Sequence, residues 1–312
     1  MNHPDNRGGA ARPNLLVILG PTASGKTRLA VAAARALNGE IISADSRQVF
    51  RGMDIGSGKD LEEYDGIPHH LIDILEPGRE FSVFDFQRHF TEAFNLVTSR
   101  GRLPVLAGGT GLYLDSVLRG YRMVTAPENP ELRRELEELS LGQLRGRLLA
   151  LLPEQHNTTD LLQRERLVRA IEIALHQEGS GNSEVIQLPA LRPLVFGIKI
   201  EREIVRRRIT ERLKSRLNGG MIDEVRRLLA DGVPVARLDS YGLEYRFVSR
   251  YLSGDLNRND MFQKLNSAIH DFAKRQDTWF RKMERHGVGI IWLDASADPL
   301  EMLLKEWHSR EA

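Results

Sequence analysis

The sequence predicts an α/β protein in which a parallel sheet flanked by helices carries a small all-helical insertion domain. Short apolar runs alternate with helix-forming segments along the first third of the chain, as in parallel sheets covered by helices on both faces. A glycine-rich phosphate-binding motif follows the first apolar run and opens a helix. After the turn-rich segment 125–130 two helical stretches interrupt the alternation. These observations predict a P-loop NTPase-like core with an insertion.

The expected elements follow from the apolar pattern and from glycine and proline positions. The expected strands are 14–19, 40–44, 103–107, 194–200 and 289–293. The expected helices include the one after the glycine-rich loop and 84–99, 131–151, 161–177 and 258–285, with another that begins near Glu201. We therefore expect a catalytic core made of residues 13–124 and 192–312, with long helices toward its end, and an insertion domain made of residues 125–191.

The composition is that of an ordinary globular protein, with 41% hydrophobic and 28% charged residues among 312. The chain has no cysteine, which excludes disulfides and cysteine-ligated zinc. The polar first dozen residues lack the apolar stretch of a signal peptide, and no run approaches the roughly 20 apolar residues of a membrane span. We expect a cytoplasmic protein with no membrane partner, and nothing in the sequence requires more than a monomer.

The charge is unevenly distributed although the formal net charge is only +1. Residues 192–285 contain 21 Lys and Arg against 13 Asp and Glu, whereas residues 125–191 contain 7 against 11. A polyanionic partner is therefore expected mainly on the later segment. A solvated basic surface is the alternative interpretation.

The most informative motif is Gly20-Pro21-Thr22-Ala23-Ser24-Gly25-Lys26-Thr27. Its backbone N–H groups and the N-terminus of the following helix can hold an anion, and Lys26 adds a full positive charge. Thr27 can offer its hydroxyl to Mg²⁺ bound by the same phosphates. The motif alone does not say which phosphate it binds.

Two further segments are expected at the same edge of the sheet, because each follows the end of a strand. Asp45 follows the strand at 40–44 and can act as a magnesium ligand or as a general base, with a helix cap as the structural alternative. Thr110 belongs to a second glycine-rich turn, Gly108-Gly109-Thr110-Gly111, whose N–H groups and hydroxyl can stabilise another anion. Two anion-binding turns around one crevice suit a diphosphate leaving group.

Other polar residues leave two interpretations open. His69 and His70 are adjacent and would point to opposite faces of a strand, so hydrogen bonding within the fold is favoured over a metal site. Arg208 and Arg212 lie one helical turn apart, where an anion would relieve their repulsion. The charged residues of the 258–285 helix can contact phosphates or lie in solvent.

Taken together, the motifs resemble the tRNA dimethylallyltransferase (tRNA isopentenyltransferase) family, bacterial type, over nearly the whole chain. The resemblance is carried by residues 20–27, Asp45-Ser46 with Gln48, 51–56, 69–73, 108–113, Arg169-Ala170-Ile171-Glu172 and Ala273-Lys274-Arg275-Gln276. It implies transfer of a dimethylallyl group from dimethylallyl diphosphate to N6 of the adenosine 3′ of the anticodon in tRNA. It also implies a magnesium ion and an anticodon stem-loop as partner.

The resemblance further assigns roles to individual residues. Asp45 would accept the N6 proton, while Lys26, Thr110 and Arg208 would stabilise the departing diphosphate held by residues 20–27, with Thr27 at the metal. The residues expected to contact tRNA are Asp45, Ser46, Arg47, Gln48, Arg166, Arg169, Lys274 and Arg281.

The chain departs from the family pattern at Gly242-Leu243-Glu244-Tyr245, where Gly-Tyr-Lys-Glu is usual, and at residues 157–160. Three other functions share parts of the pattern. An adenylate isopentenyltransferase would prenylate a free nucleotide, a P-loop small-molecule kinase would transfer the γ-phosphate of ATP, and an RNA-binding module would lack catalysis. The insertion and the basic segment favour tRNA over a free nucleotide, and the intact motifs disfavour a non-catalytic module.

Overall fold

The structure, a computed structural model, describes residues 12–123, 126–153, 163–179 and 185–310. It divides into two compact units, the first formed by Met1–Tyr121 with Leu188–Ala312 and the second by Arg122–Gln187. The departure from the family pattern at residues 157–160 lies outside the described residues. Across the described part of the chain, none of the helices has the length and apolar character needed to cross a membrane.

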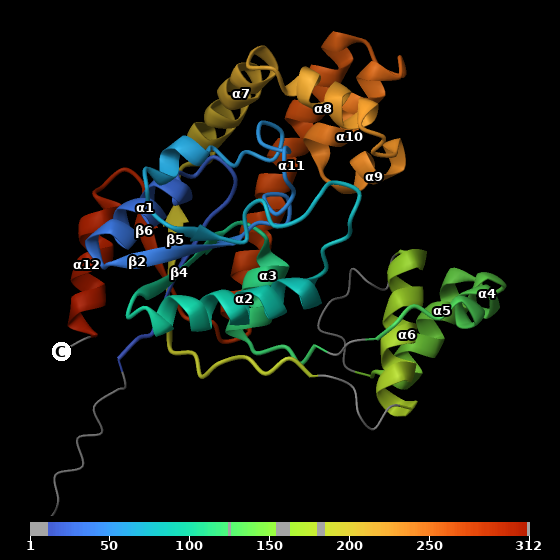
Figure 1. The fold of residues 1–312 in the computed structure, drawn as a ribbon, viewed down its shortest axis with the longest axis horizontal. Helices are drawn as coiled ribbons and strands as arrows, with labels where there is room; N and C mark the ends of the chain where they lie inside the picture. The colour runs from blue at the N-terminus through green and yellow to red at the C-terminus, as the bar shows by residue number, and fades with distance from the viewer. Residues whose placement is uncertain (1–11, 124–125, 154–162, 180–184, 311–312) are drawn as a thin grey trace, which may run out of the picture. The chain divides into compact units, whose positions relative to one another are not determined.

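The first unit is built on one parallel sheet of six strands in the order β3-β2-β4-β1-β5-β6, which confirms the predicted sheet (Figure 1). The strands are β1 Leu15–Leu19, β2 Gly39–Ala44, β3 His69–His70, β4 Leu103–Gly108, β5 Pro193–Lys199 and β6 Ile290–Asp294. Val17 of β1 pairs with Leu106 on one side and with Val195 on the other. Because all neighbouring strands are parallel, their carboxyl ends share one edge of the sheet.

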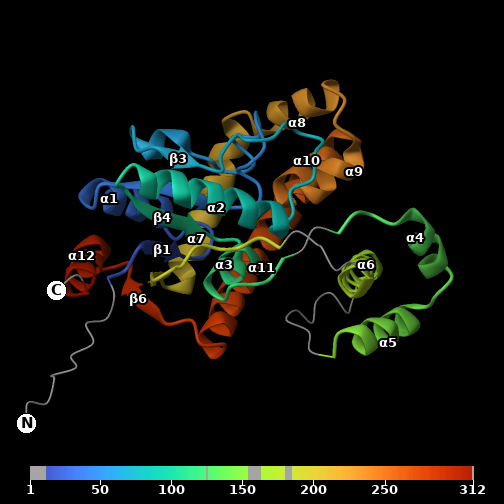
Figure 2. The same ribbon diagram turned by 60° about the horizontal axis from the view of Figure 1, so that its bottom comes forward.

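Helices cover both faces of this sheet because the central strand is apolar on both sides. Leu15, Val17 and Leu19 belong to the core shared with α2, α3 and the later part of α11, whereas Leu16 and Ile18 belong to the core shared with α1 and α12. These helices are α1 Lys26–Ala36, α2 Val83–Ser99, α3 Gly111–Leu118, α11 Arg258–Arg285 and α12 Pro299–Ser309. Figures 1 and 2 show β6 and α12 side by side at one edge of the unit.

A helical layer packs next to the sheet and contains its own core. Its helices are α7 Arg202–Asn218, α8 Met221–Ala230, α9 Val235–Ser240 and α10 Leu243–Leu252, joined by the first half of α11. The segment expected to be long helices is thus partly short ones, while α11 runs from this layer to the sheet (Figure 1). Val49, Phe50 and Met53 insert into this core from the segment after β2. The segment continues through the short 3-10 helix η1 Leu61–Tyr64.

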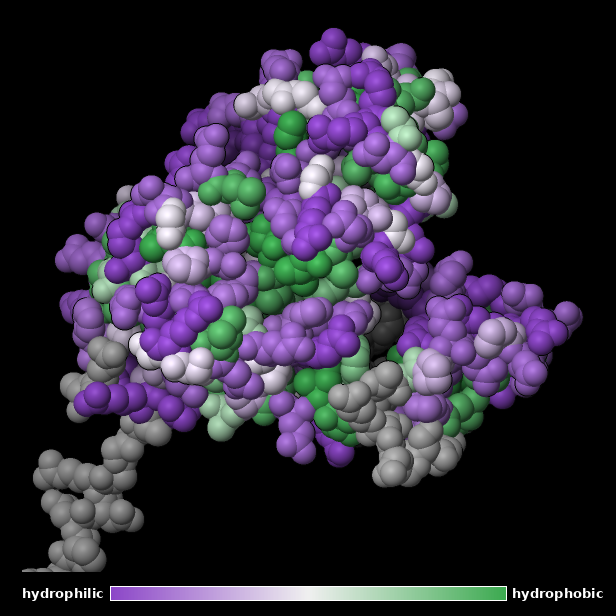
Figure 3. All heavy atoms as spheres, viewed as in Figure 1, coloured by the Kyte–Doolittle hydropathy of each residue, from purple (hydrophilic) through white to green (hydrophobic). Residues whose placement is uncertain are grey.

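Hydrophobic and hydrophilic residues are unevenly distributed over the surface of the first unit. On the face drawn in Figure 3, hydrophobic atoms gather in the middle of the first unit and hydrophilic atoms cover its edge.

The second unit is helical in its described part, with α4 Pro130–Glu137, α5 Leu141–Leu151 and α6 Arg164–Gly179. One helix was expected over 131–151, and this prediction is wrong. The chain leaves the helix after Glu137 and starts α5 with a capping box, in which Ser140 and Gln143 satisfy each other's backbone N–H groups. The break lets Leu136 and Leu144 face the same small core together with Leu167.

Candidate active site

The predicted phosphate loop connects β1 to α1 and leaves the N–H groups at the start of α1 available for an anion. Gly25 and Ala23 adopt left-handed backbone conformations, with φ of 89° and 62°. No side chain in the described part of the chain caps the N-terminus of α1, and its first turn contains no acid. The buried Ser24 hydroxyl also lacks a partner among the described residues. Unpaired donors at a helix N-terminus form an anion site.

Lys26 stands at the start of α1 with its Nζ atom 3.4 Å from the Pro21 carbonyl oxygen. The pKa of Lys26 is lowered to about 8, mainly by burial; Asp45 opposes this shift, and the positive charges of Arg212 and Arg216 contribute to it. A lysine whose pKa is lowered by burial and by neighbouring cations lies in a site that attracts anions.

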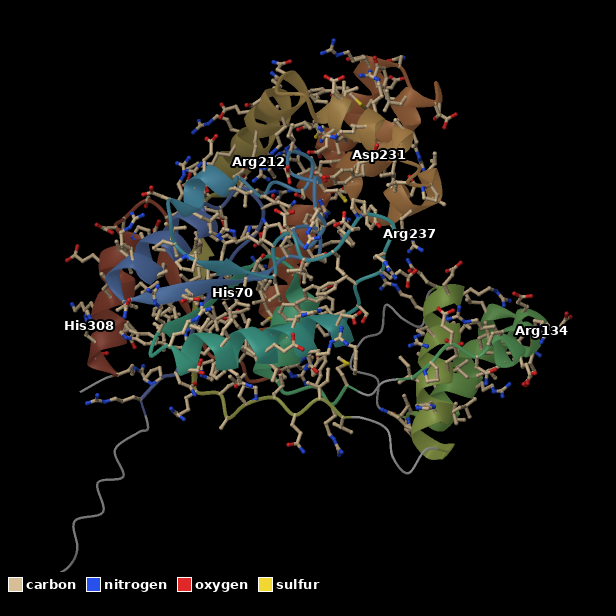
Figure 4. The ribbon with its side chains drawn as sticks, in the orientation of Figure 1. His70, Arg134, Arg212, Asp231, Arg237 and His308 are labelled. Atoms are coloured by element: carbon tan, nitrogen blue, oxygen red, sulfur yellow. The ribbon has the colours of Figure 1, made fainter. Side chains whose placement is uncertain are left out.

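Arg212, labelled in Figure 4, reaches this loop from the middle of α7, where its guanidinium donates a hydrogen bond to the Thr22 hydroxyl. Burial, followed by the charge of Arg216, lowers the pKa of Arg212 to about 10. Arg208, the arginine expected at the diphosphate, lies exposed on the same helix and has no hydrogen bond or ion pair to any described residue. The structure therefore brings Arg212 to the loop and leaves Arg208 in solvent.

The second glycine-rich turn lies beside the phosphate loop, because β4 is the neighbour of β1 in the sheet. Gly108 packs so closely on β2 that a Cβ atom there would lie 2.2 Å from the Ala44 carbonyl oxygen. Thr110 precedes α3, donates its N–H to the same carbonyl at 3.1 Å, and accepts the Ser46 N–H at 3.1 Å through its hydroxyl. These contacts hold Thr110 next to the segment that begins with Asp45.

Asp45 follows β2 at the same edge. Its Oδ1 atom accepts the Arg47 N–H at 3.0 Å, and its charge raises the pKa of the nearby Lys26. The order β2-β4-β1 thus places Asp45, Thr110 and the phosphate loop side by side. The Asp45 carboxylate, the Thr110 hydroxyl and the phosphate loop therefore lie together at one edge of the sheet.

The Thr27 hydroxyl at this edge suits a magnesium ion that is held jointly with phosphates. The described residues contain no group of three or more His, Asp or Glu side chains that could hold a metal by themselves. Mg²⁺ in phosphate sites is usually held by few protein oxygens together with the phosphates. Thr27 supplies such an oxygen from its hydroxyl at the second residue of α1.

Comparison with known proteins decides the family. The IPP transferase family model matches residues 48–283, and an isopentenyl transferase model matches residues 13–66. A tRNA dimethylallyltransferase of Syntrophotalea carbinolica is 69% identical over 95% of this chain and 99% of its own length. One of Geotalea uraniireducens is 64% identical over 92% of this chain and 95% of its own length. The chain belongs to the tRNA dimethylallyltransferase family.

Solved structures agree with this assignment. The crystal structure of a tRNA isopentenylpyrophosphate transferase from Bacillus halodurans is 33% identical, with a TM-score of 0.70 over 96% of this chain and 98% of that one. A eukaryotic dimethylallyltransferase acting on tRNA is 20% identical with a TM-score of 0.69, which supports the fold. The predicted fold class, family and prenyl-transferring enzyme class are confirmed.

In this member of the dimethylallyltransferase family, two residues expected at the RNA are bonded within the protein. Arg47 forms a 2.7 Å ion pair with Glu244 and lies over the Phe272 ring at 4.9 Å. The buried Gln48 accepts the Ser43 hydroxyl at 2.7 Å and donates to the Gly58 carbonyl at 3.2 Å. Both side chains therefore fix the segment after β2.

Two of the residues expected to contact RNA lie on α6 of the insertion. Arg169 donates to the Ala126 carbonyl at 2.6 Å and pairs with the buried Glu172 at 3.1 Å. Arg166 is exposed on the same helix. On α11 of the first unit, Lys274 and Arg281 are both exposed. Arg166, Lys274 and Arg281 thus remain candidates for RNA contact, whereas Arg169 helps to hold its own unit together.

His70, labelled in Figure 4, is hydrogen-bonded within the fold. Its Nε2 atom lies 2.7 Å from the buried Glu40 carboxylate. Although burial opposes it, His70 and Arg100 lower the pKa of Glu40. His69 instead packs against the Tyr64 ring at 4.7 Å. The two histidines thus have separate neighbours, as the strand geometry predicts.

Proposed function

We propose that this chain transfers a dimethylallyl group from dimethylallyl diphosphate to N6 of the adenosine 3′ of the anticodon in tRNA, and releases diphosphate. The observation that carries the proposal is the position of Asp45 and Thr110 beside a cation-rich phosphate loop. A kinase also needs the phosphate loop. The second anion-binding turn with Thr110 suits a diphosphate leaving group, and the adjacent Asp45 suits an amine nucleophile that must lose a proton.

The residues of the site would divide the reaction between leaving group and nucleophile. As the bond between the allylic carbon and the diphosphate oxygen breaks, negative charge develops on the diphosphate. Lys26, Arg212 and the N–H groups at the start of α1 stabilise that charge at one end, and Thr110 does so from the second turn. A magnesium ion, held by Thr27 and the diphosphate, would supply further charge neutralisation.

Asp45 accepts the proton that N6 loses as the new carbon–nitrogen bond forms. Its Oδ1 atom already accepts the Arg47 N–H, so we assign the proton from the adenine N6 to the other carboxylate oxygen. An adenosine reaches such an edge only if it leaves the base stack of the anticodon loop, at a cost of a few kcal/mol. Ser46, fixed through its N–H to Thr110, adjoins the same position.

A single assay separates this function from its rivals. The protein is incubated with Mg²⁺, labelled dimethylallyl diphosphate and either unmodified tRNA or AMP. We expect label on tRNA, because the basic surface and the insertion are of no use with a free nucleotide. Label on AMP alone would identify an adenylate isopentenyltransferase, and ATP turnover without prenyl transfer would identify a kinase.

The exposed cations of α11 provide a second test. Each of Lys274→Ala and Arg281→Ala is expected to lower the salt slope of tRNA binding by about one, because each removes one phosphate contact and its released counterion. Binding is measured as log Kd against log salt concentration. Lys305→Ala, which removes an exposed charge on α12, serves as the matched control and should leave the slope unchanged. Equal slopes for all variants would make α11 an ordinary solvated surface.

The remaining assignments follow from this function. tRNA is a cytoplasmic substrate in bacteria, so we place the enzyme in the cytoplasm. Its site is built from one copy of the first unit, and we therefore propose a monomer.

A further inference from the structure

The motif Ala273-Lys274-Arg275-Gln276 on α11 has a buried side that the proposed function does not use. Lys274 and Arg275 are exposed, whereas Gln276 is buried with 7% of its surface accessible. A buried amide must find hydrogen-bond partners, since an unpaired polar group in the interior is destabilising. The partners of Gln276 therefore indicate what the residue does.

Gln276 bonds to both anion-binding loops at once. Its Oε1 atom accepts the Thr22 N–H of the phosphate loop at 2.8 Å. Its Nε2 atom donates to the Gly109 carbonyl of the second turn at 2.8 Å. One side chain of the C-terminal part of the molecule thus joins two loops that follow different strands.

The approach of α11 to the second turn is close. A Cβ atom at Gly109 would lie 2.4 Å from the Gln276 Nε2 atom. At Gly111, it would lie 2.5 Å from the ring of Trp279, one turn further along α11. The two glycines therefore let α11 pack directly against the turn, which fixes the distance between the Gln276 backbone and the Gly109 carbonyl.

The chemistry of the two partners requires a donor and an acceptor on one side chain. Thr22 presents an N–H and Gly109 presents a carbonyl. If the Gln276 amide were reversed, its NH₂ group would face the Thr22 N–H and its oxygen would face the Gly109 carbonyl. Thr22 is also held through its hydroxyl by Arg212. The first loop is thereby fixed at two atoms by helices α7 and α11.

We propose that Gln276 is a positioning residue, which sets the separation of the two loops so that both can bind one diphosphate. The inference rests on the proposed function, because a shared diphosphate is the reason for a fixed separation. Gln276 acts through Thr22 and Gly109, and its amide is occupied by them.

Gln276→Met tests this role, because it keeps the length of the side chain and removes the amide. We expect the Kd for inorganic diphosphate with Mg²⁺, measured by calorimetry, to rise about tenfold. The Thr22 N–H and the Gly109 carbonyl lose their shared partner, so the separation of the two loops is no longer fixed. The KM for dimethylallyl diphosphate should rise in parallel, and the Kd for tRNA should stay within about twofold of wild type.

Gln87→Met is the matched control. Gln87 is a fully buried glutamine on α2 that donates to the Ser116 and Tyr121 carbonyls at 2.8 and 3.0 Å. Its loss removes a buried amide of the same kind from the same unit. We expect a lower melting temperature and an unchanged diphosphate Kd, which separates positioning from stability.

Gln276→Glu gives a readout in pH. A protonated carboxyl group can replace the amide, because its O–H donates to Gly109 and its carbonyl oxygen accepts from Thr22. The carboxylate opposes Gly109 and competes with diphosphate for the cations Lys26 and Arg212. The other charged groups that act on these two cations are Asp45, Asp60, Arg216 and Glu244, and Arg275 and Asp277 adjoin position 276 in the sequence. The diphosphate Kd of this variant, relative to Gln276→Met, should fall as the pH is lowered from about 8 to about 5, toward the range where carboxyl groups protonate.

Each outcome decides for or against the proposal. A normal diphosphate Kd in Gln276→Met, or an equal loss in Gln87→Met, would show that Gln276 only stabilises the fold. A constant ratio between the Glu and Met variants over this pH range would contradict the donor–acceptor argument. If the wild-type protein bound no diphosphate and prenylated no tRNA, the proposed function itself would be wrong. If it did both, only the role of Gln276 would be in question.

Discussion

Replacing Asp45 by asparagine or alanine is expected to lower kcat for prenyl transfer to tRNA about 10²–10⁴-fold, as for the loss of a general base. An asparagine side chain can still accept the Arg47 N–H that Asp45 accepts at 3.0 Å, so the segment should keep its conformation. It cannot accept the proton that leaves N6. Single-turnover rates with saturating tRNA isolate the chemical step, and the Kd for tRNA should change little.

The control for this prediction is the neighbouring acid Asp60. Asp45 and Asp60 both raise the pKa of Lys26, but Asp60 is tied to Arg216 at 3.1 Å in the turn before η1. If the effect of Asp45 were only to balance charge at Lys26, Asp60→Asn would lower the rate by a similar factor. We expect less than about a fivefold change for Asp60→Asn, in the range of a partly exposed ion pair. Similar losses in both variants would remove Asp45 from the role of base.

The parts of the fold that the sequence predicts well are those whose signals are local. The strand–loop–helix pattern around residues 20–27 and the turn at 108–111 each combine an apolar run with glycines that the structure uses at strand ends. The break between α4 and α5 also has a local signal. Ser140 followed by Gln143 forms the capping box, and the continuous apolar pattern over 131–151 concealed it.

The parts that the sequence predicts poorly depend on contacts between distant segments. Arg212 and Arg208 are equivalent candidates in the sequence, since both lie on one helix among other arginines. Only the packing of α7 brings Arg212 to Thr22, which is 190 residues away in the chain. The same holds for Arg47, whose partner Glu244 is 197 residues away. The acid at position 244, where lysine is usual in the family, was a signal that an arginine is paired there.

Replacing Lys26 should have the second large effect. Lys26→Met is expected to lower kcat/KM for dimethylallyl diphosphate about 10²–10³-fold, because it removes a partly buried charge from the position where negative charge develops. Lys26→Arg keeps the charge on a group that stays protonated throughout the accessible pH range. Both variants are compared with wild type in the prenyl-transfer assay and in calorimetry with inorganic diphosphate.

The pH dependence distinguishes Lys26 from the other cations of the site. Burial, Arg212 and Arg216 hold the pKa of Lys26 at about 8 in the free protein, and a bound diphosphate would raise it because opposite charges favour the protonated form. Above pH 8, binding must therefore take up a proton, so wild-type affinity should fall with rising pH, by up to tenfold per unit. Below this pKa the lysine is already charged, and the affinity gains nothing from it on further acidification.

The titration of diphosphate itself is common to all variants and cancels in the ratio to wild type. Since Lys26→Arg and Lys26→Met lack a group that titrates near pH 8, the advantage of wild type over Lys26→Met should shrink above that pH. A constant ratio would mean that Lys26 does not carry the charge that binds the diphosphate.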